Sequence, residues 1–223
     1  MARKSQNRKV KKVIYVFWEG ESEEAYSKFL KNEFEDYAVI KCHREKGTFQ
    51  KVYSSYKNDR KFKSMVEELD EIWIFFDTEL EMGRQWREKQ RYLDDIRKSR
   101  TNDNIKIRLL MTTGCVEYWL LLHYKKVAPN IAIPADKEKV MNELKKYESS
   151  YKKGDYKAIS NIAKRYLYAI DNGKWTLERL KDDGLPENEI ERDQWLFKGE
   201  HTFTTVHEAV LKLENLKKSS MND

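Results

Sequence analysis

The sequence predicts an α/β fold with an open, mostly parallel sheet and flanking helices, followed by a mainly helical C-terminal region. Up to about residue 124, short segments of β-branched and aromatic residues alternate with segments of helical periodicity. The strand-like segments are continuously apolar, which is typical of parallel strands covered on both faces. Beyond Pro129 the alternation stops and only helical periodicity remains.

Four segments fit the strands of this sheet. They are residues 12–18 ("KVIYVFW"), 37–42 ("YAVIKC"), 71–77 ("EIWIFFD") and 105–111 ("IKIRLLM"). Because right-handed crossovers join parallel strands, we expect their carboxyl ends to lie at one edge of the sheet.

Helices are expected after each strand and throughout the last part of the chain. Ser22 is a suitable N-cap for the first of them, and apolar residues then recur at helical spacing up to Phe34. The expected helical segments are residues 22–34, 48–69, 84–99, 115–124, 135–147, 155–172 and 201–218. The chain therefore divides into a basic N-terminal arm (1–12), an α/β core (13–128) and a helical region packed on that core (129–223).

Composition limits the classes of function. Charged residues make up 37% of the chain and aromatic residues 13%, which is typical of a folded protein with a strongly solvated surface. The formal net charge of +6 favours a polyanionic partner such as nucleic acid. The two cysteines have no metal-binding spacing and indicate a reduced, cytoplasmic protein. No apolar segment is long enough to cross a membrane.

Acidic residues follow three of the four predicted strands. Glu19 follows the first strand, Asp77, Glu79 and Glu81 the third, and Glu117 the fourth. Ligands bind at the carboxyl ends of the strands in such sheets, so we expect a shared site there. Clustered carboxylates need protons or cations to neutralise them, and hard oxygen ligands suit Mg²⁺ or Mn²⁺. The alternative is that these acids only solvate the strand ends.

Two histidines and two lysines are further candidates. His123 lies six residues after Glu117, so the two point to nearly opposite sides of an ideal helix. His123 is therefore either a catalytic residue or a hydrogen-bonded structural one. His207, near the start of the last helix, is open to the same two interpretations. Lys152 and Lys153 either contact phosphate or belong to a solvated basic loop.

Four segments resemble the RloB-like proteins, a branch of the Toprim superfamily associated with bacterial and phage defence. They are "VFWEGESEEAY", "IWIFFDTE", "CVEYWLLLHY" and "TTVHEAVLKL", and they occur in the expected order within residues 12–215. The resemblance implies a Toprim-like nuclease core in which acids bind Mg²⁺.

The resemblance also implies roles for individual residues. Glu19 matches the Toprim glutamate and Asp77 the first aspartate of a later acidic motif. Glu79 stands where a second aspartate is usual, so the sequence departs from the family pattern at this position. The expected catalytic residues are Glu19, Asp77, Glu79, Glu117, His123 and His207. Of these, Glu19, Asp77 and Glu79 are the expected metal ligands. Lys152 and Lys153 are expected to bind nucleic acid.

These features predict a metal-dependent nuclease of antiviral defence, with RNA, including tRNA, favoured over DNA. A defence-system ATPase or another effector is an expected partner, and the oligomeric state stays open. The alternative is a non-catalytic nucleic-acid-binding or regulatory subunit of a defence complex, in which Glu79 marks a decayed site. A phosphoryl- or nucleotidyl-transfer enzyme is a third candidate, although the chain has no Walker A motif.

Overall fold

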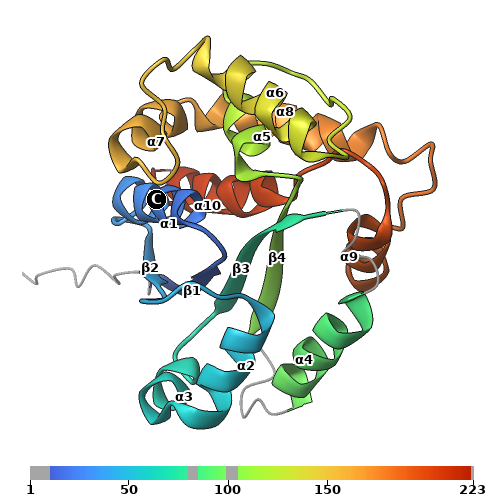
Figure 1. Ribbon diagram of the computed structural model, residues 1–223. Helices are drawn as coiled ribbons and strands as arrows, with labels where there is room; N and C mark the ends of the chain where they lie inside the picture. Colours follow the sequence, from blue (N-terminus) through green and yellow to red (C-terminus); the bar gives the residue numbers. More distant parts are fainter. Residues whose placement is uncertain (1–10, 80–84, 99–104, 222–223) are drawn as a thin grey trace, which may run out of the picture.

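The computed structural model describes residues 11–79, 85–98 and 105–221. They form a four-stranded parallel sheet in the order β2-β1-β3-β4, which confirms the predicted α/β class (Figure 1). The strands are β1 (Lys12–Trp18), β2 (Ala38–Cys42), β3 (Glu71–Thr78) and β4 (Lys106–Thr113). Residues 1–10 of the expected basic arm lie outside the described residues, and Lys12 already belongs to β1.

Strand β3 explains why the strand segments are continuously apolar. Trp73 and Phe75 join one buried cluster, whereas Ile74 and Phe76 join another on the opposite face. Successive side chains of a strand alternate between faces, and both faces of this strand are covered. The same alternation places Asp77 on the face of Trp73 and Phe75.

Helices cover both faces of the sheet (Figure 1). The face of Trp73 is covered by α1 (Glu21–Glu33), α5 (Val116–Leu121), α6 (Pro134–Lys145), α7 (Tyr156–Ala163), α8 (Tyr166–Glu178) and α10 (Val206–Met221). The opposite face is covered by α2 (Phe49–Asn58), α3 (Arg60–Val66), α4 (Trp86–Lys98) and α9 (Glu189–Lys198). Helices from the last part of the chain therefore share both hydrophobic clusters with the strands. Within the described ranges, no helix is long and apolar enough to span a membrane.

Several helices differ from the sequence-based expectation. The segment 48–69 forms two helices because Asp59 has an extended backbone and its carboxylate accepts hydrogen bonds from the N–H groups of Lys61 and Phe62. The segment 155–172 is divided near Arg165, which precedes α8. Helix α5 ends at Leu121, before the expected end, and α9 is not predicted from the sequence.

A buried carboxylate joins the sheet to the last helix. Glu71, at the start of β3, is 2% exposed and accepts hydrogen bonds from Trp73 Nε1 at 2.6 Å and Arg108 Nε at 3.3 Å. Lys212 of α10 completes the group with an ion pair to Glu71. Burial alone would raise the pKa of Glu71, but Arg108, Lys212 and Trp73 outweigh it and hold that pKa below its usual value.

Replacing Glu71 with Ala is expected to lower the free energy of unfolding by about 3 kcal/mol, because Arg108 and Lys212 both lose their contact with a buried carboxylate. Urea unfolding measures this loss. The control is Lys12→Ala, which removes a surface pair with Asp70 and should cost less than about 1 kcal/mol. Equal losses in the two variants would contradict a special role for Glu71.

Candidate functional site

The strand order changes direction between β1 and β3. The chain runs from β1 to β2 on one side and then crosses to β3 on the other. In open parallel sheets such a switch point leaves a crevice beyond the carboxyl ends of the two central strands. Glu19 directly follows β1, and Asp77 is the penultimate residue of β3, so both lie at this crevice.

A pocket of about 450 Å³ opens at the crevice. The structure brings four of the sequence-predicted acids to its wall, namely Glu19, Asp77, Glu79 and Glu117. The first turn of α1, the start of α5 and two lysines from the C-terminal region complete the lining. Glu81, a further acid considered from the sequence, lies outside the described residues.

Asp77 presents a buried carboxylate oxygen to the pocket. Its Oδ1 atom is buried and has no hydrogen-bond partner among the described residues. Burial raises the pKa of Asp77 well above its usual value, and the carboxylates of Glu23, Glu19 and Glu117 raise it further. The negative charge of Asp77 is therefore costly unless a proton or a cation neutralises it.

Glu19 is fixed beside Asp77 at the mouth of the pocket. Its Oε2 atom accepts a hydrogen bond of 3.1 Å from the backbone N–H of Asp77, which joins the ends of β1 and β3. Much of the Glu19 side chain is exposed on its outer side. Burial of the carboxylate nevertheless raises its pKa, against the opposing effects of that hydrogen bond and of Lys89.

Glu23 is a pocket residue that the sequence analysis misses. Acids are common in the first turn of a helix because of the helix dipole, so its position has an ordinary explanation. In the structure Glu23 is 3% exposed, and burial together with the charges of Glu19 and Glu117 raises its pKa to about 7. Its spacing of four residues from Glu19 across a glycine turn is the signal that could have identified it.

Gly20 allows the side chain of Glu23 to approach that turn. A Cβ atom at residue 20 would lie 2.9 Å from Oε2 of Glu23, closer than side chains normally pack. A larger residue at position 20 would therefore require the Glu23 carboxylate to shift from its present position.

Glu117 is held by the loop that follows α6. It is 1% exposed, and its Oε1 atom accepts a hydrogen bond of 2.7 Å from the hydroxyl of Tyr151. Lys153 Nζ lies 4.0 Å from the same oxygen. The neighbouring Lys152 is exposed and does not line the pocket, so the structure separates the two lysines that the sequence groups together.

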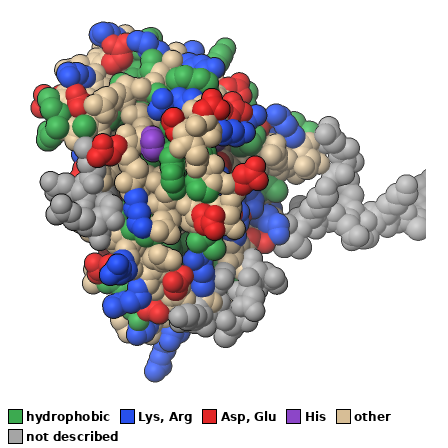
Figure 2. Space-filling view, turned by 90° about the vertical axis from the view of Figure 1, so that its right-hand side faces the viewer, with side chains coloured by type: hydrophobic (Ala, Val, Ile, Leu, Met, Phe, Trp, Pro, Cys, Tyr) green, Lys and Arg blue, Asp and Glu red, His purple; other side chains and the backbone are tan. Residues whose placement is uncertain are grey.

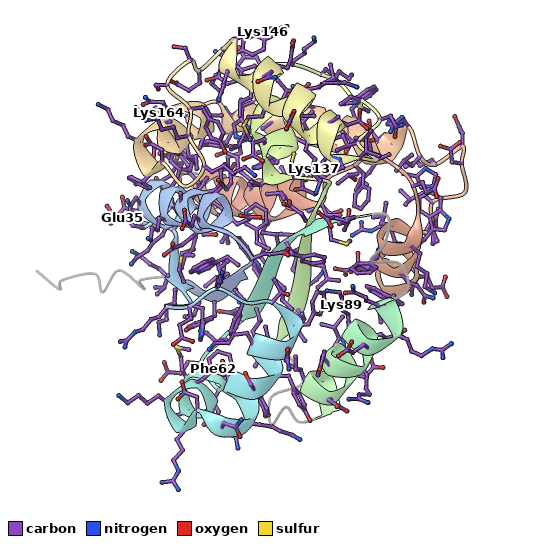
Figure 3. The ribbon with its side chains drawn as sticks, in the orientation of Figure 1. Glu35, Phe62, Lys89, Lys137, Lys146 and Lys164 are labelled. Carbon is purple, nitrogen blue, oxygen red and sulfur yellow. The ribbon has the colours of Figure 1, made fainter. Side chains whose placement is uncertain are left out.

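Lysines from both helical layers flank the carboxylates. Lys137 of α6 forms an ion pair with Glu79, so the Glu79 carboxylate already has a partner. Lys89 of α4 lies in the opposite layer, with its Nζ atom 5.0 Å from the ring centroid of Phe49. Figure 3 shows Lys89 and Lys137 on opposite sides of this edge of the sheet. The sequence does not indicate either lysine, because packing between distant segments places them there.

His123 and His207 lie in the interior, outside the described lining of the pocket. His123 is fully buried, with Nε2 3.2 Å from the hydroxyl of Tyr26 and Nδ1 3.0 Å from the carbonyl oxygen of Trp119. His207 Nδ1 lies 3.0 Å from the carbonyl oxygen of Thr204. Burial lowers the pKa of His123 to about 3 and that of His207 to about 4. The structure therefore gives both histidines packing and hydrogen-bonding roles and does not bring them to the carboxylates.

The donor chemistry of the pocket suits a hard cation. Glu19, Glu23, Asp77 and Glu117 supply carboxylate oxygens, and Asp77 Oδ1 is a buried donor atom without a partner. In the described part of the chain, no three Asp, Glu, His or Cys side chains are grouped so that they could hold a metal ion as they stand. Binding an ion in this pocket would therefore require the carboxylates to reorient.

A family model described as "RloB-like protein" matches residues 14–213. The chain belongs to the RloB-like family. The match extends from β1 into α10, so it includes every described residue that lines the pocket of this RloB-like protein. Neither a curated protein nor a solved structure matches the chain.

In the metal-free RloB-like protein, Glu23→Gln is expected to raise the midpoint of thermal unfolding at pH 8 by several degrees. The pKa of Glu23 rises from its usual 4.5 to about 7 on folding, so the folded state binds the proton more tightly. Stability is therefore lost as the pH rises from about 4.5 to about 7, and the uncharged Gln avoids this loss.

Thermal unfolding in the presence of a chelator measures the effect at pH 5 and pH 8. Glu35→Gln is the control, because it removes an exposed acid just beyond the same helix that does not line the pocket. The gain should be large at pH 8 and small at pH 5. An equal gain at both pH values, or an equal gain in the control, would contradict the raised pKa of Glu23.

Proposed function

We propose that this RloB-like protein is a metal-dependent nuclease with a Toprim-like core, which hydrolyses phosphodiester bonds of nucleic acid in antiviral defence. The observation that carries the proposal is the buried, unpartnered Oδ1 of Asp77 within a group of carboxylates at the switch point of the sheet. The family resemblance supports the defence role and a partner such as a defence-system ATPase or another effector. The two cysteines, which have no metal-binding spacing, support a cytoplasmic location.

The charge balance of the pocket favours Mg²⁺ or Mn²⁺ as the cofactor. Burial and the neighbouring carboxylates raise the pKa values of Glu23 and Asp77, so each would gain from a nearby cation. Asp77 and Glu19 would hold the ion, and Glu79 would join them on release from Lys137. When bound, such an ion activates water and stabilises the negative charge that develops on a phosphodiester.

The lysines that line the pocket would bind the phosphates of the nucleic acid. Lys137 and Lys153 line the pocket on the side of the C-terminal helices, within reach of a phosphate that approaches the carboxylates. Positively charged side chains hold a nucleic-acid backbone without reading its sequence. We favour RNA, including tRNA, over DNA because the family resemblance indicates a compact, toxin-like effector.

Asp77→Asn and Glu19→Gln are each expected to reduce cleavage of RNA or DNA pools in Mg²⁺ or Mn²⁺. We expect losses on the order of 100-fold, the scale on which electrostatic stabilisation of a transition state contributes. EDTA should abolish cleavage by the unsubstituted protein. Glu35→Gln, which changes an exposed acid beyond α1, should leave cleavage unchanged. Cleavage that survives both pocket substitutions and EDTA would exclude this mechanism.

The second candidate function is a non-catalytic, nucleic-acid-binding or regulatory subunit of a defence complex. Two observations favour it. The Glu79 carboxylate is paired with Lys137. Among the described residues, no three Asp, Glu, His or Cys side chains are grouped so that they could hold a metal ion. In this alternative the acids serve the fold or a partner and bind no metal.

Calorimetric titration with Mn²⁺ separates the two functions. The nuclease proposal predicts a saturable heat of binding that is lost in Asp77→Asn and kept in Glu35→Gln, because Asp77 contributes a buried, unpartnered oxygen to the pocket and Glu35 does not line it. No measurable binding to the unsubstituted protein would instead favour the regulatory subunit.

A further inference from the structure

We propose that Trp195 and His201 form a stacking platform for an unpaired nucleobase, at the far end of a groove that begins at the carboxylate pocket. The platform would take a single-stranded segment of nucleic acid whose backbone reaches the pocket. This inference deepens the proposed function, because it identifies which form of nucleic acid the site accepts.

Three hollows in the surface adjoin one another and define the groove. The carboxylate pocket shares Glu79 with a narrow cleft of about 10 Å³ between the ends of β3 and β4 and the loop after α9. That cleft shares Gly199 and His201 with a wider hollow of about 440 Å³ on α9. The three hollows are therefore connected in series by shared lining residues. Because the middle one has room for only about one water molecule, a strand would pass over it between the carboxylates and the platform.

The two rings of the platform are stacked on each other. Their centroids lie 4.2 Å apart, and their planes are inclined by only 10°. Both residues are half-buried and line the wide hollow. Gly199 makes room for the pair, because a Cβ atom at that position would lie 2.6 Å from Cδ2 of His201.

The platform is fixed relative to the pocket. Trp195 packs against the hydrophobic cluster on the α9 side of the sheet. The carbonyl oxygen of His201 accepts a hydrogen bond of 2.9 Å from Oγ1 of Thr113, at the end of β4. Thr113 pairs with Thr78, the residue after Asp77, so the platform is attached to the strand beside the one that carries the buried carboxylate. A strand of nucleic acid would thus meet two contact points of fixed separation.

The chemistry of the wide hollow suits a base better than a duplex. Flat aromatic surfaces stack on any nucleobase and hold single strands with little sequence preference. Gln194, Lys198 and Glu191 also line the hollow and supply polar groups of both charge signs beside the rings. Figure 2 shows that positive and negative side chains are interspersed on the face that carries α4 and α9. A duplex would instead require an extended basic surface along its phosphates.

The test measures binding of a fluorescein-labelled, ten-nucleotide single-stranded RNA in EDTA, where metal-dependent cleavage is absent. The same RNA annealed to its complement and a version with abasic sites serve as comparison ligands. We expect the single strand to bind more tightly than the duplex, and Trp195→Ala and His201→Ala each to weaken that binding on the order of 10-fold. Abasic sites should weaken binding to the unsubstituted protein and have little further effect in Trp195→Ala.

Two control variants keep the test decisive. Trp175→Ala removes another half-buried tryptophan that lies outside the groove, and it should bind the single strand as the unsubstituted protein does. His201→Ala keeps the backbone carbonyl that bonds to Thr113, so it tests the platform even where Trp195→Ala unfolds. Unchanged binding in folded Trp195→Ala and His201→Ala, or equal binding of duplex and single strand, would overturn the platform.

The stacking platform and the nuclease activity can be disproved separately. Binding that depends on Trp195 and His201, without metal-dependent cleavage of any pool, would exclude the nuclease activity and support the stacking platform. Cleavage that depends on Asp77 but is indifferent to Trp195, His201 and abasic sites would overturn the platform and leave the nuclease standing.

Discussion

The main physical constraint in this structure is that the fold places several carboxylates together at the carboxyl edge of a parallel sheet. The strand order places the ends of β1 and β3 side by side, and the hydrogen bond from the backbone of Asp77 to Glu19 fixes them there. Glu23 and Glu117 then approach from the helices on the same side of the sheet. Their mutual repulsion and burial raise the pKa values of Glu23 and Asp77, a cost that functional sites bear more often than structural ones.

The two ends of β3 show how a partner changes the state of a buried acid. Glu71, at its start, is surrounded by Arg108, Lys212 and the indole N–H of Trp73, so its pKa falls in spite of burial. Asp77, near its end, has a buried oxygen without a partner, and its pKa rises. Burial raises the pKa of both acids, and positively charged or hydrogen-bonding partners decide whether the net pKa shift is upward or downward. At its carboxyl end, β3 therefore carries a buried carboxylate oxygen that accepts no hydrogen bond from the described residues.

Much of this arrangement follows from the sequence, because strand periodicity and the position of an acid at a strand end are local properties. The four strands and the meeting of Glu19, Asp77 and Glu117 are predicted on that basis. Glu23 is missed because an acid in the first turn of a helix needs no further explanation. Lys137 and the stack of Trp195 with His201 arise from contacts between distant segments and leave no local pattern. The helix break at Asp59 follows from a capping hydrogen bond that helical periodicity does not reveal.

The most direct test of the central claim is a crystal structure determined in saturating Mn²⁺ with anomalous diffraction data. We expect an anomalous peak within bonding distance of Oδ1 of Asp77 and of at least one oxygen of Glu19 or Glu23, because these atoms carry the unbalanced charge. A pocket without an anomalous peak, in which Asp77 is protonated and shares a hydrogen bond with a neighbouring carboxylate, would show that the pocket does not hold a metal ion.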